Sequence, residues 1–281
     1  MSAFKIVRMR HAVSALALSA VGATVMAQQP PRPEPASPIT DRFALRASAF
    51  WGSVKTDGRV DDPAAPTGGT PFSLENDFGL SPHAHQVRAE FMFRMRERNR
   101  LRVDLWEVNR TGSAFPATTI VYNTHTFTPT DRVNSEFNWR QIDFTYTYSF
   151  LKRSRFELGA GLGLHLIEAE ANADATLATG PVREKFSGAG PFATIAVDGT
   201  WRITRRFAFA ARGQYFSLKV NDIKGALGDY NADLQFRWRP NLAFGIGYHS
   251  SQAKLEIANS NPNGLMKLGT HGPEAFVRAS F

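Results

Sequence analysis

The sequence predicts an all-β protein, a transmembrane antiparallel up-and-down β-barrel of about ten strands. About ten segments between residues 41 and 281 alternate apolar and polar side chains with a period of two, as strands between lipid and a polar interior do. The last of them is Gly272 to Phe281, where Ala275, Val277 and Ala279 share the parity of the terminal aromatic residue. Phe276 is the exception on the other face, which also carries Glu274, Arg278 and Ser280.

The amino terminus has the pattern of a secretory signal peptide. Lys5, Arg8 and Arg10 precede an apolar run from 12 to 25, and small residues before Gln28 suit a signal peptidase. The predicted signal peptide is 1–27, followed by a Pro-rich periplasmic leader at 28–40 that we interpret as a spacer, and by the barrel at 41–281. No later stretch approaches the roughly 18 to 20 apolar residues of a transmembrane helix.

Composition excludes several classes of function. Removal of 1–27 leaves about 254 residues with a net charge of about +5, which fits one barrel domain. The chain has no Cys, so it has neither disulfides nor a thiolate metal site. Basic residues alternate with carboxylates and form no stripe, which argues against nucleic acid as a partner. GAGLGL lies within a predicted strand and opens no helix, so it is no phosphate loop, and we expect no cofactor.

The strands and links follow one scheme. In the clearest strand, Ile142, Phe144 and Tyr146 oppose Gln141 and Asp143. The predicted strands are 43–52, 86–96, 101–110, 141–150, 155–168, 193–201, 207–215, 230–238, 242–249 and 272–281. Short turns are predicted near 97–99, 152–154, 203–204 and 240–241, and longer outer loops at 56–82, 112–132, 170–188, 221–227 and 258–268. This alternation places both termini in the periplasm.

The signal peptide, the polar face of the strands and the terminal Phe281 favour a membrane barrel over a water-soluble β-sandwich or barrel. Aromatic residues near the strand ends suit the interfacial girdles of a bilayer. These residues are Trp51, Tyr148, Phe150, Trp201, Phe207 and Trp238.

Four stretches together resemble a group of largely uncharacterised outer-membrane β-barrel proteins of Gram-negative bacteria. They are FSLENDFGL (72–80), SFLKRSRFELGAGLGLHL (149–166), YFSLKVNDIKGAL (215–227) and HGPEAFVRASF (271–281). The resemblance spans nearly the whole mature chain. It implies a fold and a place in the outer membrane, and it implies no reaction. A barrel in that membrane is expected to contact outer-membrane lipid and lipopolysaccharide.

The parity opposite the apolar one gives a nearly balanced set of charges for the lumen. We expect these charges to form an ion-pair network that fills the barrel, with a narrow selective pore as the alternative. Gly159, Gly161 and Gly163 leave space that bulky residues of neighbouring strands are expected to fill. The predicted lumen residues are Arg46, Arg88, Glu90, Arg94, Arg96, Arg102, Asp104, Asp143, Glu157, Asp198, Arg212, Asp233, Arg237, Glu274 and Arg278.

The sequence offers one enzymatic alternative. His249 and Ser251 form an H-x-S-x-A stretch that resembles the active-site strand of lipid A deacylases, in which a His activates the Ser for ester hydrolysis. Their parity faces the lumen, whereas such an enzyme attacks a membrane lipid. The nearest acid, Glu256, is at an unsuitable spacing.

Other candidate sites are sparse. His83 and His85 share a parity but have no neighbouring ligands, so they are expected at the outer rim and no metal site is predicted. Asp61, Asp62, Glu75 and Asp77 make the first outer loop acidic, and we interpret that loop as solvated or facing lipopolysaccharide. The segment 118–128 is expected to extend a hairpin above the membrane.

We therefore expect a non-enzymatic envelope protein, either structural or a narrow channel. The carboxy-terminal Phe281 also resembles the terminal aromatic of the signal that the barrel assembly machinery recognises. The sequence leaves the oligomeric state open.

Overall fold

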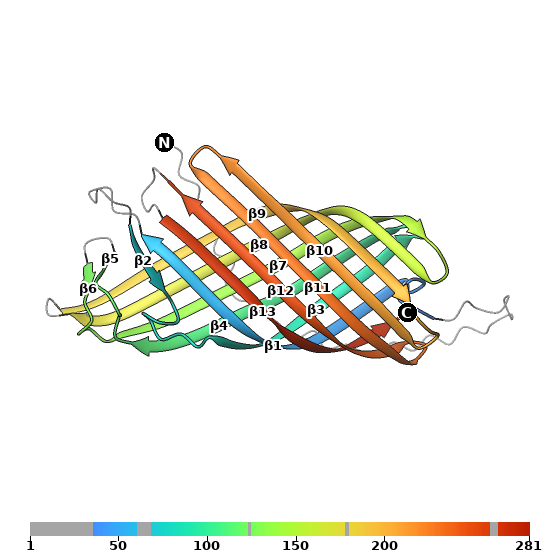
Figure 1. The fold of residues 1–281 in the computed structure, drawn as a ribbon, viewed down its shortest axis with the longest axis horizontal. Helices are drawn as coiled ribbons and strands as arrows, with labels where there is room; N and C mark the ends of the chain where they lie inside the picture. The colour runs from blue at the N-terminus through green and yellow to red at the C-terminus, as the bar shows by residue number, and fades with distance from the viewer. Residues whose placement is uncertain (1–35, 61–68, 123–124, 178–179, 259–263) are drawn as a thin grey trace, which may run out of the picture. The chain divides into compact units, whose positions relative to one another are not determined.

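A computed structural model describes residues 36–60, 69–122, 125–177, 180–258 and 264–281. Ten long antiparallel strands close into a barrel (Figure 1), which confirms the predicted fold class. In the described part of the chain no helix is long and apolar enough to cross a bilayer. The barrel strands are β1 Phe43–Val60, β3 His83–Arg96, β4 Asn99–Ala114, β7 Val133–Lys152, β8 Phe156–Leu177, β9 Gly180–Arg202, β10 Phe207–Val220, β11 Ile223–Arg239, β12 Leu242–Ile257 and β13 Gly264–Ser280.

The last strand closes the barrel on the first. β13 pairs antiparallel with β1, with Ala44 opposite Ser280 and Ala47 opposite Val277. The backbone of Phe281 continues this pairing, since its carbonyl oxygen accepts bonds from the amides of Arg42 and Phe43 at 3.1 and 3.0 Å. Every barrel strand therefore has two hydrogen-bonded neighbours, and the membrane-spanning sheet has no open edge.

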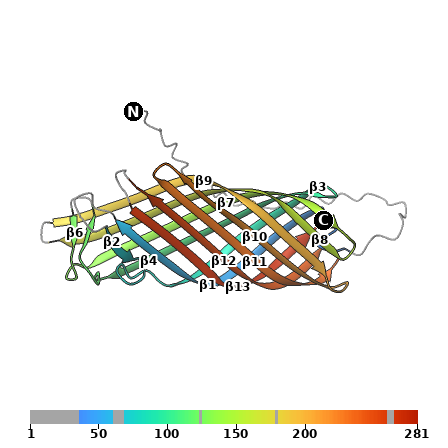
Figure 2. The same ribbon diagram turned by 45° about the horizontal axis from the view of Figure 1, so that its top comes forward.

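Four short turns lie at the end of the barrel that carries the C terminus, which we call the turn end (Figure 2). They join β3 to β4, β7 to β8, β9 to β10 and β11 to β12, where short turns were predicted. Two of them are closed by backbone bonds, from Arg153 N to the oxygen of Phe156 at 2.7 Å and from Thr204 N to that of Phe207 at 3.0 Å.

At the opposite end, the loop end, the strands run further than predicted. Residues 170–188 were predicted as a loop, yet most of them form the ends of β8 and β9, and Ala171 stands opposite Phe186. Residues 221–227 were also predicted as a loop, but only Asn221 and Asp222 lie outside strands there. Asn221 adopts the left-handed conformation (φ 51°) that tight hairpin turns require and Asn tolerates.

Three short strands occupy the loop end (Figure 1). β2, Thr70–Ser73, pairs with the end of β1, so that Gly58 faces Phe72. β5, Ile120–Tyr122, and β6, His125–Phe127, form a separate two-stranded hairpin within the predicted loop 112–132. These elements fold over the end of the barrel and supply part of its inner surface.

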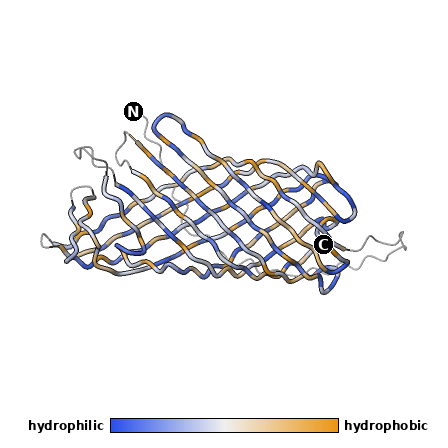
Figure 3. Tube along the Cα trace, viewed as in Figure 1, coloured by the Kyte–Doolittle hydropathy of each residue, from blue (hydrophilic) through white to orange (hydrophobic). Residues whose placement is uncertain are grey.

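Nearer the turn end the outward side chains are apolar and exposed, with Val87 at 77% and Ile195 at 65%. Orange and blue alternate along these strands in Figure 3. Apolar side chains that water would penalise are stable in contact with lipid, so this belt is the membrane-facing surface. We call it the membrane band; it comprises 43–51, 87–95, 101–105, 142–150, 156–166, 193–201, 207–215, 230–238, 242–248 and 273–281.

Beyond the membrane band the polarity of the two faces inverts without a break in the strands. On β7, Ile142 faces outward and Gln141 inward, but in the preceding residues Arg140 is outward and Trp139 inward. The inward apolar residues form a cluster that we call the loop-end core: Val54, Leu80, Ala84, Trp106, Val108, Phe137, Trp139, Ile167, Ala169, Leu227 and Leu268. Where water surrounds the barrel, its interior is thus packed like that of a soluble protein.

Candidate functional site

The end of the leader is folded into the turn end of the lumen. Ser37, Pro38 and Ile39 are buried, and a turn holds them, with Thr40 N bonded to the oxygen of Ser37 at 2.9 Å. Pro38 also borders a small polar cavity together with Arg46 and Arg278 of the lumen. The segment predicted as a spacer therefore ends, from Ala36 onward, as a plug; residues 28–35 lie outside the described residues.

Asp41 attaches this plug to the barrel wall. Its carboxylate accepts two hydrogen bonds from Arg237, at 3.1 and 2.6 Å, and lies 3.2 Å from Arg278. Arg94 donates to the carbonyl oxygen of Asp41 at 3.3 Å. A bidentate arginine–carboxylate pair of this kind fixes the orientation of both side chains in addition to pairing their charges.

The next layer is held by Arg94 and Arg100. Arg94 donates two bonds to Glu157, at 2.7 and 3.0 Å, and Arg100 donates one to Asp198 at 2.6 Å. Gly159 makes this possible, because a Cβ there would lie 2.5 Å from the Arg100 guanidinium and 2.6 Å from the Asp198 carboxylate. The space left by this glycine is filled by side chains from neighbouring strands.

The middle layer centres on Arg46 and Arg212. Arg46 pairs with Asp233 at 2.7 Å and with Glu274. Phe276 lies under it with the ring centroid 3.6 Å from the guanidinium carbon, which explains why an aromatic residue occupies a lumen position.

Arg212 joins two further carboxylates, Glu90 at 2.6 Å and Asp104 at 3.3 Å, while Arg102 approaches Glu90 at 3.4 Å. Each carboxylate in this layer thus has a guanidinium partner, as buried charges require.

The outermost polar layer of the membrane band is a hydrogen-bond network around His165. Its Nδ1 lies 2.7 Å from Asp143, its Nε2 contacts Thr194 and Gln214 at 3.1 Å each, and its ring is fully buried. Gln141 continues the network by donating to Asp143 at 2.9 Å. A network that joins four strands in this way fixes their relative register.

His249 and Ser251 face the lumen and are both buried. His249 Nε2 lies 3.4 Å from Asp229, and its ring meets the edges of Phe50 and Trp106 at centroid distances of 5.9 and 6.5 Å. Within the described ranges no hydrogen bond joins His249 to Ser251. Neither residue reaches the lipid surface, so the geometry gives no support to the esterase alternative.

Charges in the lumen are close to balance. The structure adds Arg100, Asp41 and Asp229 to the predicted set, and it places Arg96 exposed at the end of β3. Arg100 has the parity of Arg102, but the predicted strand began one residue after it. The charges of these polar layers are Arg46, Arg88, Arg94, Arg100, Arg102, Arg212, Arg237 and Arg278, with Asp41, Glu90, Asp104, Asp143, Glu157, Asp198, Asp229, Asp233 and Glu274. Arg110 and Asp77 are also buried, at the loop end.

The loop-end core closes the lumen above this network. Trp106 and Trp139 lie against one another at 6.4 Å between ring centroids, and Phe137 and Val108 are completely buried beside them. Arg88 forms the junction with the polar part, since its guanidinium lies 5.4 Å from the centre of the Trp106 ring. This apolar layer was not predicted from the sequence, although the inward parity of β4 and β7 continues through these residues.

The carboxylates of the acidic loop hold the segments around them in place through hydrogen bonds. Glu75 accepts bonds from Arg110 and from the amide of Thr56, and Asp77 accepts from Ser73 N at 2.7 Å and Ala117 N at 3.1 Å. Asp61 and Asp62 lie outside the described residues.

His83 and His85 are exposed, as expected. In the described ranges no group of three or more His, Asp or Glu side chains could hold a metal ion.

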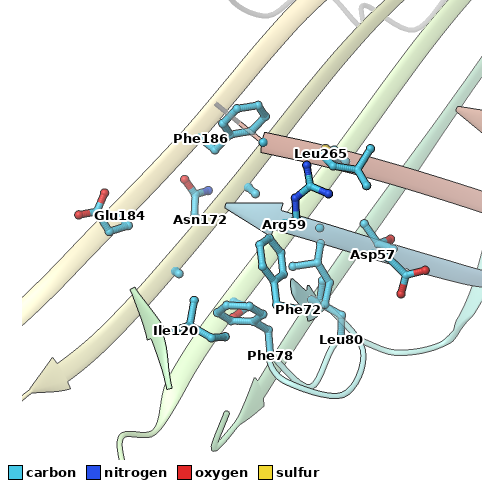
Figure 4. Close-up of a pocket in the computed structure, with 18 of the residues that line it drawn as sticks. Asp57, Arg59, Phe72, Phe78, Leu80, Ile120, Asn172, Glu184, Phe186 and Leu265 are labelled. Carbon is cyan, nitrogen blue, oxygen red and sulfur yellow. The ribbon is translucent and has the colours of Figure 1, made fainter. Parts of the chain in front are cut away.

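Above the loop-end core lies a cavity of about 190 Å³ (Figure 4). Its walls come from β1, β2, β5 to β9, β12 and β13 and from the segment 74–80. The apolar side chains around it are Phe72, Leu74, Phe78, Leu80, Ile120, Phe127, Phe186, Leu255, Ile257, Leu265 and Met266.

Comparison with known proteins bears on the fold alone. No family model matches the sequence, and no curated protein matches it. The outer membrane protease OmpT from Escherichia coli is similar in structure with a TM-score of 0.53 at 10% identity, over 85% of this chain and 97% of OmpT. OprG from Pseudomonas aeruginosa matches with a TM-score of 0.33 at 9% identity, over 86% of this chain and 97% of that one.

Neisserial surface protein A matches with a TM-score of 0.30 at 13% identity, over 85% and 97% of the two chains. Of these three structures, OmpT alone has a TM-score above 0.5, so the likeness to OmpT is the one that bears on the architecture. Together these neighbours are outer-membrane β-barrel proteins, and they carry no family assignment or activity to this chain.

Proposed function

We propose that this protein is a closed β-barrel of a Gram-negative outer membrane with a structural role in the envelope, and that it does not conduct solutes. The proposal rests on the observation that side chains fill the lumen at successive levels from the plug to the loop-end core. Support for the location comes from the lipid-facing band, the export signal expected at 1–27 and the outer-membrane neighbours.

Closure is redundant, because two seals of different chemistry lie in series. At the turn end, Ile39 is 1% exposed, and Asp41 is hydrogen-bonded to Arg237 and ion-paired with Arg278. At the loop end, Trp106, Phe137 and Trp139 pack across the lumen. The polar cavity that Pro38, Arg46 and Arg278 border within the charged layers has a volume of about 50 Å³, room for one or a few water molecules.

Conductance in planar bilayers tests closure. We expect no discrete steps from the intact protein. Deletion of residues 28–41 removes the plug and is still expected to leave the barrel silent, because the loop-end core remains. Discrete steps from the intact barrel would overturn the proposal, whereas steps from the deletion variant alone would show that the plug is the sole seal.

The carboxy terminus is proposed to direct assembly through the barrel assembly machinery. Phe281 is 75% exposed at the turn end, so its ring is accessible and contributes little to the lumen. We expect deletion of Phe281 to lower the amount of heat-modifiable barrel in isolated outer membranes severalfold. Phe281→Tyr, which keeps a terminal aromatic ring, is the control and is expected to assemble normally. Normal levels of the truncated chain would contradict the role.

A further inference from the structure

The loop-end cavity is a separate candidate for function, because the structural role needs no cavity. Phe72 and Phe78 pack edge to face on one side, with 5.7 Å between ring centroids, and Phe186 and Leu265 lie on the other side in Figure 4. Its volume of about 190 Å³ exceeds the roughly 150 Å³ of a dry apolar cavity known to hold a benzene molecule.

Small residues of the wall create this space. Ala171 and Ala173 on β8 and Ser135 on β7 all border the cavity, and in the described structure Ala173 stands opposite both Ser135 and Glu184. Larger side chains at these positions would complete the packing begun by the loop-end core. A cavity within an apolar cluster lowers the stability of the fold, because its lining side chains lack packing partners. A hydrophobic ligand that fills the cavity would supply those contacts and bury its own apolar surface.

The apolar lining of the cavity selects against ionic ligands. Two of the charged residues at its wall, Asp57 and Glu136, lie on the outer faces of their strands, where Asp57 is 3.1 Å from Lys55 and Glu136 accepts bonds from two asparagine side chains. Glu184 lies on the inner face, 3.6 Å from His125. An ionic ligand would lose its hydration among apolar side chains, and an anion would also meet the carboxylate of Glu184, so a neutral ligand is favoured.

We propose that this cavity binds a compact, neutral, hydrophobic molecule of one or two fused rings. The ligand enters from the loop end and stops there, because the loop-end core lies beneath it and Leu80 belongs to both. The protein thus acts as a surface binding protein for such molecules. This inference does not depend on whether the barrel conducts.

Methionine residues provide a direct probe, since the barrel has one in each environment. Met266 lines the cavity, Met92 lies buried in the lumen and Met95 is exposed in the membrane band. We would label the methionine methyl groups with ¹³C in the full chain reconstituted in lipid nanodiscs, because detergent tails would compete for the cavity. Assignment uses Met→Leu variants, and the ligand probe is 2-naphthol, with 2-naphthoate as its anionic counterpart.

We expect 2-naphthol to shift the Met266 resonance saturably while Met92 and Met95 stay unchanged, and 2-naphthoate to bind at least tenfold more weakly. Ala173→Phe fills the cavity and should abolish the shift. Ala171→Leu is a milder filling variant and should weaken binding at least tenfold. Ala193→Phe, on the outer face, is the matched control and should bind as the parent does.

Three results would overturn the proposal. They are an unchanged Met266 resonance, equal non-saturating shifts of all three methionines, which indicate partition into lipid, and undiminished binding by well-folded Ala173→Phe and Ala171→Leu variants. Conductance data do not affect these outcomes.

Discussion

The two halves of the lumen are built on the same strands and the same inward parity, yet their chemistry is opposite. Towards the turn end, β7 directs Asp143, Thr145 and Thr147 inward, and towards the loop end it directs Phe137 and Trp139 inward. The outward residues invert at the same point. The lesson is that the solvent outside the barrel, lipid or water, decides which face of a strand is apolar, while the pleat only decides which residues share a face.

The two halves also hold together differently. In the membrane band, desolvated guanidinium groups and carboxylates stabilise one another only as complete pairs, so removal of one partner is costly. In the loop-end core, stability comes from apolar packing and scales with the atoms removed. Substitutions in each half of the lumen separate these two cases.

The largest effect is expected for Arg46→Ala. It leaves Asp233 and Glu274 buried without their guanidinium partner, which should lower the free energy of unfolding by about 3–5 kcal/mol. Urea unfolding in lipid vesicles measures this loss. The control is Lys55→Ala, which removes an exposed pair with Asp57 and should change little. A loss below about 1 kcal/mol for Arg46→Ala would mean that the network does not hold the band together.

A somewhat smaller effect is expected for Leu268→Ala in the loop-end core. Leu268 is buried, and its truncation should cost about 2–5 kcal/mol through lost burial and the cavity it leaves. The neighbouring Lys267→Ala points outward and is the control. Because the two halves are packed separately, Leu268→Ala and Arg46→Ala should add within about 0.5 kcal/mol. Strong coupling in the double variant would show that the two halves form one unit.

The smallest effect is expected at the strand tips beyond the membrane band. The Arg183 guanidinium bonded to Asp174 lowers the pKa of that carboxyl group below its ordinary value of 3.8. A lowered pKa means that the pair contributes above that ordinary value and is lost as the pH falls through the lowered one. Both groups are exposed, so Asp174→Asn should leave the unfolding midpoint unchanged at neutral pH. A clear downward shift would show that the tips are more rigid than their exposure suggests.

The difference between the two halves of the lumen also explains which parts of the fold could be predicted from the sequence. Within the membrane band, the residues that face lipid are apolar and those that face the lumen are polar. The strands containing Ile142, Ile195 and Ile246 follow this pattern, and they were predicted near their observed positions. Beyond the band the outward residues are polar and the inward ones apolar, so the alternation expected of a lipid-facing strand is lost. Ala171 and Ala173 therefore did not look like strand residues, and the segment 170–188 was predicted as a loop. The site was harder, because partners such as Arg100 and Asp198 come from strands that are distant in the chain.

The sequence by itself determined the barrel, its lipid-facing parity and which charges turn inward, because these depend on periodicity along single strands. Only the tertiary structure decided which arginine meets which carboxylate, that Asp41 anchors a plug, that side chains pack across the lumen at both ends and that an apolar cavity remains at the loop end. These features depend on the register between strands and on side chains meeting across the lumen, and neither is encoded in the pattern of any one strand.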